Sequence, residues 1–144
     1  MLDIRPIDTR IAVAPQIDPA DVATLKAAGF ATVVNNRPDG EEPGQPSGEA
    51  VAQACAQAGL AYHAIPITHA GFTHAQVIAM AELLGTADGP ILAYCRSGTR
   101  SCHLWALATA GLGADPDDVI AAARGAGYDL SGARSLLEAV SPKA

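Results

Sequence analysis

Basic residues and long hydrophobic runs are both scarce in this chain. Nine lysines and arginines stand against fifteen aspartates and glutamates, which gives a formal net charge of −6. Such an acidic protein is a poor partner for nucleic acid or for an anionic membrane surface, so we expect neither. No stretch is long and apolar enough for a membrane helix, and no basic start followed by an apolar run suggests a signal peptide. We therefore expect a cytoplasmic protein.

Cysteine and histidine are also few. Three cysteines at irregular spacing cannot form a fully paired disulfide framework, which favours a reducing location. The histidines at positions 63, 69, 74 and 103 lack spacings typical of metal ligands, such as His-x-x-x-His. We expect no metal and no cofactor, so any catalysis would depend on the side chains and backbone of the chain itself.

Strand and helix patterns alternate along the chain, and no linker or internal repeat divides it. Apolar and β-branched segments predict strands within residues 4–14, 30–35, 60–67 and 91–94. This order predicts a single α/β domain over residues 1–144, with a central, mostly parallel sheet of four to five strands flanked by helices. The expected helix N-caps are Asp18, Ser47, Thr73, Asp115 and Ser131.

Two of these helices carry specific predictions. The Thr73-x-x-Gln76 capping box opens one helix, and Gly85 is expected to end it. The helix that begins at Ser131 is expected to turn an apolar stripe towards the core, because its apolar residues follow the spacing i, i+3, i+4, i+7. The stripe consists of Ala133, Leu136, Leu137 and Val140.

The segment Ile91–Ser101, which reads ILAYCRSGTRS, has the pattern of a catalytic loop. Its four apolar residues predict a buried strand with Cys95 at the carboxyl end, and an apolar helix follows a tight turn at Gly98. A strand–loop–helix of this kind points backbone N–H groups at an anion near the helix N-terminus. The same field, with Arg96 and Arg100 nearby, favours a nucleophilic thiolate. The alternative is an ordinary buried cysteine.

Two further loops are expected at the same edge of the sheet. Residues 36–46 form a long polar stretch with three prolines and two glycines, and residues 68–72 follow the next strand. Ligands bind beyond the carboxyl ends of the strands in sheets of this kind. Long loops inside compact domains also tend to be functional. Both loops are therefore expected beside Cys95.

The Cys95–Ser101 loop resembles the signature loop that cysteine-based phosphatases and rhodanese sulfurtransferases share. Ile11–Gln16, Thr32–Arg37 and Tyr62–Pro66 together resemble the layout of dual-specificity phosphatases, and the Gly-His-Ile-x-Gly-Ala stretch expected of a rhodanese is missing. A narrower resemblance, over roughly residues 3 to 140, is to the phosphatase-like domain of beta-lactamase-hydrolase-like (Blh) proteins, a family also grouped with sulfur transferases. It rests on Asn36–Glu42, Gln45-Pro46, Cys95–Ser101, Trp105 and Gly127–Leu130.

The resemblance implies roles for these residues. Cys95 would be the nucleophile, Arg100 would clamp the anion, and Ser101 would offer its hydroxyl to the thiolate as it leaves. Trp105 is expected to pack the loop from below. The implied ligand is a small anion, either a sulfane sulfur donor or a phosphate ester. A partner enzyme in trans is also implied, because Blh-like domains can be fused to a metal-dependent hydrolase or dioxygenase. The backbone cradle would comprise Arg96, Ser97, Gly98 and Thr99, with the N–H of Arg100.

Two departures from the phosphatase pattern favour sulfur transfer. Only four residues separate Cys95 from Arg100, whereas protein-tyrosine-type phosphatases resemble one another in having five, so the loop is shorter by up to roughly 3.5 Å of contour. The Thr68–Phe72 loop has no carboxylate where such phosphatases place a general acid, and losing one forfeits roughly 10²–10⁴-fold in rate. We therefore expect a sulfurtransferase working through a Cys95 persulfide. The alternatives are a phosphatase working through a Cys95 phosphocysteine and a non-catalytic anion-binding module.

Three residues outside the cysteine loop are further candidates for substrate binding. Arg37 follows a strand and could bind the anion, or it could pair with Glu41 or Glu42 and shape its own loop. Asp39 belongs to an Asp-Gly turn signal. Asp39, Glu42 or His69 could also replace the missing general acid.

Overall fold

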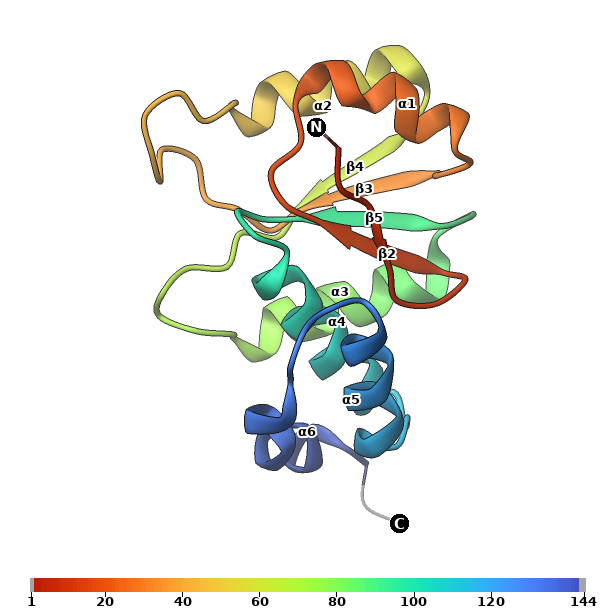
Figure 1. Cartoon of the computed structure of the whole chain (residues 1–144), viewed down its shortest axis with the longest axis vertical. Helices are drawn as coiled ribbons and strands as arrows, with labels where there is room; N and C mark the ends of the chain where they lie inside the picture. Colours follow the sequence, from red (N-terminus) through yellow and green to blue (C-terminus); the bar gives the residue numbers. More distant parts are fainter. Residues whose placement is uncertain (1, 143–144) are drawn as a thin grey trace.

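The computed structural model describes residues 2–142 and contains a five-stranded sheet in the order β1-β2-β5-β3-β4 (Figure 1). Strands β2, β5, β3 and β4 run parallel, and β1 pairs antiparallel with β2 at one edge. The predicted α/β class with a mostly parallel sheet is therefore confirmed. The strands are β1 (Arg5–Pro6), β2 (Ile11–Ala14), β3 (Thr32–Asn35), β4 (Ala61–Ala64) and β5 (Ile91–Tyr94).

Helices cover both faces of the sheet (Figure 1). On one face lie the 3₁₀ turn η1 (Pro19–Asp21), α1 (Val22–Ala27) and α2 (Gly48–Ala58). On the other lie α3 (His74–Thr86), α4 (Thr99–Gly111), α5 (Pro116–Gly125), the 3₁₀ turn η2 (Ser131–Ala133) and α6 (Arg134–Val140). The helix α4 lies between the sheet and the outer helices α5 and α6 and also packs on α3, so most of its residues are buried.

The sheet separates two hydrophobic cores, because successive strand residues point to opposite faces. In β2, Ile11 and Val13 join the core beneath α3 and α4. The intervening Ala12 and Ala14 join the core beneath α1 and α2. All four are buried, as expected for a strand covered on both faces, and this explains the unbroken apolar run in the sequence. None of the described helices is long and apolar enough to span a membrane.

Helix α3 begins as predicted and ends later than predicted. Thr73 and Gln76 form the capping box: the Thr73 hydroxyl accepts from the Gln76 N–H at 3.2 Å, and the Gln76 side chain accepts from the Thr73 N–H at 2.8 Å. Gly85 does not end the helix, which continues to Thr86. The helix stops where Ala87 takes an extended conformation.

The prediction for the last helix was wrong in two respects. Ser131 does not cap it, because its hydroxyl donates to Asp129 and a 3₁₀ turn precedes α6. Within the predicted stripe only Leu137 is fully buried, and Leu136 is 48% exposed. Helix α6 is a short outer helix that packs on α4 and α5, so only a narrow band of its surface is buried. The apolar spacing therefore predicts more burial than the structure shows.

Candidate active site

The loops that follow β5, β3 and β2 meet at the carboxyl edge of the sheet and are joined through their backbones. The Asn36 N–H donates to Tyr94 O at 2.8 Å, and the Ile67 N–H donates to Asn36 O at 2.9 Å. On the other side of β5, the Gln16 N–H donates to Arg96 O at 3.2 Å. The expected convergence of the 36–46 segment on the cysteine loop is therefore observed.

Cys95 stands directly after β5 with its side chain fully buried. Its Sγ atom accepts a hydrogen bond from the Gly98 N–H at 3.1 Å. Gly98 is the N-cap of α4, so the sulfur lies at the start of a helix of 13 residues, where the backbone field favours negative charge. The sulfur thus occupies the position at a helix N-terminus where an anion would also be bound.

Gly98 has a backbone conformation that other residues rarely adopt. Its φ angle is 88°, and a Cβ atom added there would collide with the Tyr128 hydroxyl. That hydroxyl donates to Ser97 O at 3.0 Å, so Tyr128 supports the loop from the segment after α5. Trp105 was expected in this supporting role. It instead lies buried in the core and borders a hollow beside Arg10, at the opposite end of the sheet.

We predict that Gly98→Ala destabilises the protein and impairs the site. Both the positive φ angle and the collision with Tyr128 act against a methyl group, and strain of this kind costs roughly 1–3 kcal/mol. Thermal unfolding measures the loss, and anion binding reports the site. Gly132→Ala is the control, since nothing lies within 4 Å of its added Cβ. Equal melting temperatures for the two variants would contradict the prediction.

Arg100 uses one end of its guanidinium to bind Glu41. Nη1 and Nη2 donate to the two carboxylate oxygens of Glu41, each at 2.8 Å. Nη1 also donates to Ile67 O at 2.8 Å. The hydrogen bond with Glu41 raises the pKa of Arg100 above its ordinary value. The Cys95 side chain also lies near enough to raise the pKa of Arg100 further. Of the five N–H donors, Nε–H and one on Nη2 form no hydrogen bond to an oxygen of residues 2–142, and they share one edge of the group.

Arg37 takes the structural role that was one of its two expected uses. Its side chain is 1% exposed, and its Nε donates to Glu41 at 2.9 Å. Nη2 donates to Glu42 at 2.9 Å and Nη1 to the Gln16 side chain at 3.0 Å. The ion pair with the loop carboxylates is therefore the arrangement observed, and each of its three nitrogens has a partner inside the protein.

The two arginines hold Glu41 in its ionised form. Hydrogen bonds from Arg100 and then Arg37 lower the pKa of the Glu41 carboxyl to about 2. The pKa of Glu42 is also lowered, mainly by its hydrogen bond with Arg37. At neutral pH neither carboxylate has a proton to give to a leaving group.

Ser101 is buried, and its hydroxyl donates to Asn36 Oδ1 at 2.8 Å. Its single proton is therefore directed to Asn36 in this structure, and the expected bond to the Cys95 sulfur is not made. Asn36 in turn donates to Ile65 O at 2.9 Å, so the pair ties α4 to two neighbouring loops. Asn36 was not among the side chains predicted for the site, although a polar residue directly after an apolar strand was a signal for it.

The remaining candidates lie around the loop at different depths. The side chain of Arg96 is 68% exposed and 3.7 Å from Glu42. The Ser97 hydroxyl donates to the Thr99 hydroxyl at 2.9 Å, at the surface. Asp39 accepts from the Gly48 N–H at 2.8 Å, which places it at the start of α2. His69 is exposed, and within residues 2–142 neither His69 nor Asp39 makes a hydrogen bond to residues 95–101.

The other cysteines do not join the site. Burial raises the pKa of the Cys102 thiol to about 12, which suits a core residue and not a resolving thiol. Cys55 lies in the core beneath α1 and α2. Among the residues described, no three of His, Cys, Asp and Glu lie close enough to hold a metal ion.

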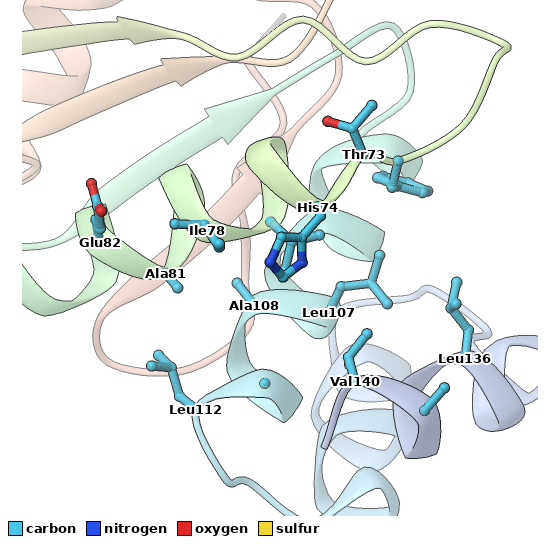
Figure 2. A pocket seen from close by; sticks show the side chains of 14 residues that line it. Thr73, His74, Ile78, Ala81, Glu82, Leu107, Ala108, Leu112, Leu136 and Val140 are labelled. Carbon is cyan, nitrogen blue, oxygen red and sulfur yellow. The ribbon is translucent and has the colours of Figure 1, made fainter. Parts of the chain in front are cut away.

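A hollow of about 780 Å³ lies away from this chemistry, between α3, α4 and α6 (Figure 2). The large hydrophobic side chains that are exposed in the described part of the chain, Ile78, Leu112 and Leu136, all line it. None of residues 95–101 does. A second hollow, of about 510 Å³, is bordered by Arg37, Tyr62 and residues of the loops after β3 and β4, on the side of the active-site edge.

A buried cysteine beyond a central parallel strand, at the start of a helix whose first turn carries an arginine, is the arrangement expected of a cysteine-phosphatase-like domain. The chain belongs to the family described as beta-lactamase hydrolase-like protein, phosphatase-like domain, whose model matches residues 3–112. The resemblance seen in the sequence is thereby confirmed. A beta-lactamase hydrolase-like protein from Agrobacterium fabrum is 37% identical over 133 residues, which make up 92% of this chain and 31% of the relative. The chain thus spans about a third of the length of the curated relatives it matches.

Solved structures place the fold among phosphatases. The crystal structure of a candidate phosphatase from Neisseria meningitidis Z2491 is 35% identical, with a TM-score of 0.83 over 95% of this chain and 97% of that chain. Kinase associated phosphatase, solved with its catalytic-site cysteine replaced by serine, is 18% identical, with a TM-score of 0.71 over 95% of this chain and 91% of that chain. At 18% identity the similarity shows the fold alone.

Proposed function

We propose that this chain is a cysteine-dependent phosphatase that acts on small phosphate esters. The observation that carries the proposal is the Cys95 sulfur at the start of α4, bonded to the Gly98 N–H, with Arg100 five residues further along the chain. The similarity to a candidate phosphatase over nearly the whole chain supports it. The loop length and the missing carboxylate favoured sulfur transfer in the sequence. The relatives compared above give sulfur transfer no support.

The proposed reaction has two steps on the same sulfur. The Cys95 thiolate attacks phosphorus, the bond from phosphorus to the ester oxygen breaks, and the leaving oxygen takes a proton. Water then attacks the phosphocysteine and releases phosphate and the thiolate. The backbone N–H groups of residues 96–100 and the free edge of Arg100 would bind the non-bridging oxygens, where charge gathers during transfer.

The source of the proton for the leaving group sets the expected substrate range. Residues 68–72 carry no carboxylate, and Glu41 and Glu42 are held ionised by arginines. We therefore expect a marked preference for esters whose leaving group needs no proton. Asp39 and His69 remain the candidates for a general acid with poorer leaving groups.

We predict that p-nitrophenyl phosphate is hydrolysed roughly 10²–10⁴-fold faster than a simple alkyl phosphate, because no positioned acid assists the alkoxide. A series of aryl phosphates, with kcat plotted against the pKa of the leaving phenol, measures this dependence. A flat plot would mean that a general acid is present and would contradict the prediction.

A substrate panel tests the function itself. The purified protein is assayed for phosphate release from aryl phosphates, and for transfer of sulfur from thiosulfate or glutathione persulfide to cyanide or glutathione. The proposal expects turnover of the phosphate esters only. Turnover of the sulfur donors with no phosphate release would contradict the proposal and support the sulfurtransferase hypothesis. Binding of phosphate without turnover of either the phosphate esters or the sulfur donors would support the third hypothesis, a non-catalytic anion-binding module.

A further inference from the structure

The peptide group that joins Ser97 to Gly98 is hydrogen-bonded at both of its ends. Its N–H, which belongs to Gly98, donates to Cys95 Sγ at 3.1 Å. Its carbonyl, which belongs to Ser97, accepts from the Tyr128 hydroxyl at 3.0 Å. The C=O and N–H of a planar trans peptide group point in opposite directions. The bond to Tyr128 on one side of the loop therefore sets the direction of the N–H that meets the sulfur on the other side.

Glycine by itself would leave this peptide group free to turn. Its orientation depends on rotation about the two bonds that flank it, and glycine accepts backbone angles that other residues avoid. Gly98 already lies at a φ angle of 88°. If the group turned over, its carbonyl oxygen would face Cys95 and repel a thiolate. A donor that holds the carbonyl on the far side of the loop prevents this rotation.

Tyr128 is presented to the loop by the end of α5. Gly127 has a φ angle of 97°, and its N–H donates to Arg124 O at 3.0 Å. The Tyr128 N–H donates to Ala123 O at 2.9 Å, which completes a Schellman motif. The ring of Tyr128 is buried in the core beneath α3 and α4, and the guanidinium carbon of Arg5 lies 5.4 Å from the ring centre. The hydroxyl is therefore fixed from both its backbone and its ring.

The hydroxyl of Tyr128 acts as a neutral donor. Burial raises the pKa of Tyr128 above its ordinary value, so its proton is present at neutral pH. A hydrogen bond to the carbonyl end of a peptide group also polarises it and strengthens the bond that its N–H end donates. Loss of the hydroxyl would thus weaken the N–H bond to Cys95 through both direction and strength.

Removal of this hydroxyl alters no charge around the sulfur. The titratable side chains that interact electrostatically with Cys95 come from two elements: Arg100 and Cys102 on α4, and Tyr128 beyond α5. Glu41, from the loop after β3, contacts this group through Arg100. A phenylalanine at position 128 leaves the charged groups in place, so a change in the ionisation of Cys95 would report the hydrogen bond.

We infer that Tyr128 is a positioning residue for the nucleophile: by holding the Ser97 carbonyl, it keeps the N–H of the same peptide group directed at the Cys95 sulfur. The inference deepens the proposed function and rests on its assignment of Cys95 as the reacting thiol. The opposing interpretation is that Tyr128 only packs against the loop and contributes stability.

The test follows the ionisation of Cys95 in the wild type, Tyr128→Phe and Tyr62→Phe. The ultraviolet absorbance of the thiolate is recorded against pH, and the signal of the same protein carrying Cys95→Ser is subtracted. An N–H donor stabilises the charged form of the thiol, so its loss moves ionisation to higher pH. We expect the midpoint in Tyr128→Phe to rise by about 0.5 to 1 pH unit.

Tyr62→Phe is the matched control, because it also removes one tyrosine hydroxyl. That hydroxyl accepts from Asn35 Nδ2 at 3.0 Å, and within the described chain it makes no hydrogen bond to residues 95–101. We expect its Cys95 midpoint to equal that of the wild type, whatever its melting temperature. Coincident midpoints in all three proteins would overturn the inference in favour of packing alone. Equal shifts in both variants, or a shift of Tyr128→Phe to lower pH, would overturn it as well.

A second measurement applies if Tyr128→Phe does not fold. The Gly98 amide is then followed by NMR in the wild type, where a peptide group held at both ends should exchange its proton slowly and change its chemical shift as Cys95 ionises. Exchange as fast as in an open loop would overturn the inference. None of these readouts needs turnover, so a protein that hydrolyses no phosphate ester would defeat the proposed function and leave the role of Tyr128 to the titration.

Discussion

Replacing Cys95 by serine should reduce phosphate-ester turnover by at least about 10³-fold while leaving the fold intact. A serine hydroxyl is far less acidic than a thiol and has no adjacent base here to activate it, so the nucleophile is lost. Serine nearly matches cysteine in size, and its oxygen can accept from the Gly98 N–H as the sulfur does. Phosphate release from p-nitrophenyl phosphate measures turnover, and phosphate binding by calorimetry should persist.

Cys102→Ala is the control for this result. Cys102 is buried one turn into α4, and its thiol has a pKa raised to about 12, so it is not expected to react. We expect a modest loss of stability from the small cavity and essentially full activity per folded molecule. A Cys95→Ser variant that retains a tenth or more of wild-type turnover would contradict the assignment of the nucleophile.

Replacing Arg100 by lysine should lower kcat/KM by about 10²-fold or more, despite the conserved charge. Lysine is a point charge without the planar fork that binds Glu41 with one edge and, in the proposed function, would bind an anion with another. Loss of a donor aimed at developing charge typically costs roughly 10²–10³-fold in kcat. Steady-state kinetics on aryl phosphates, together with phosphate binding, separate the loss in kcat from the loss in affinity.

Arg96→Lys is the comparison variant, because Arg96 has the same chemistry on the same loop but a side chain that is 68% exposed. We expect it to change kcat/KM by no more than a few-fold, through weaker attraction of the substrate anion. If both lysine variants lose activity equally, the forked contact of Arg100 is not what the site depends on.

The cysteine loop could be predicted because its parts are adjacent in sequence. Cys95, Gly98 and Arg100 lie within six residues, and the strand before them and the helix after them each have a clear local pattern. Helix α2 was predicted for the same reason. Its N-cap at Ser47 and its left-handed C-cap at Gly59 are decided by nearest neighbours along the chain.

The contacts that organise the loop could not be found in this way. Arg100 meets Glu41 across 59 residues, and Ser101 meets Asn36 across 65. The Tyr128 hydroxyl reaches Ser97 across 31 residues and takes the supporting place expected for Trp105. Each pairing depends on which loops the strand order brings together. Many polar residues in the sequence have the right chemistry to be a partner, so the sequence could not single out the one that is used.

The choice between sulfur transfer and phosphate hydrolysis also depended on both kinds of information, local sequence features on one hand and the structure and its relatives on the other. Loop length and the missing carboxylate are local features, and taken alone they favoured a persulfide. The solved relative at 35% identity favours the phosphatase hypothesis. The ion pairs with arginine lower the pKa values of Glu41 and Glu42, which explains why neither is expected to act as the general acid.

By itself, the sequence determined that a loop containing Cys95, Gly98 and Arg100 joins a buried strand to a helix, because capping, turn geometry and apolar spacing act between residues close in the chain. The tertiary structure alone decided which side chains orient that loop and which edge of Arg100 remains free. The physical reason is that an ion pair has direction and partner only once packing brings together groups from the segments that follow β3 and β5, strands more than fifty residues apart that lie side by side in the sheet.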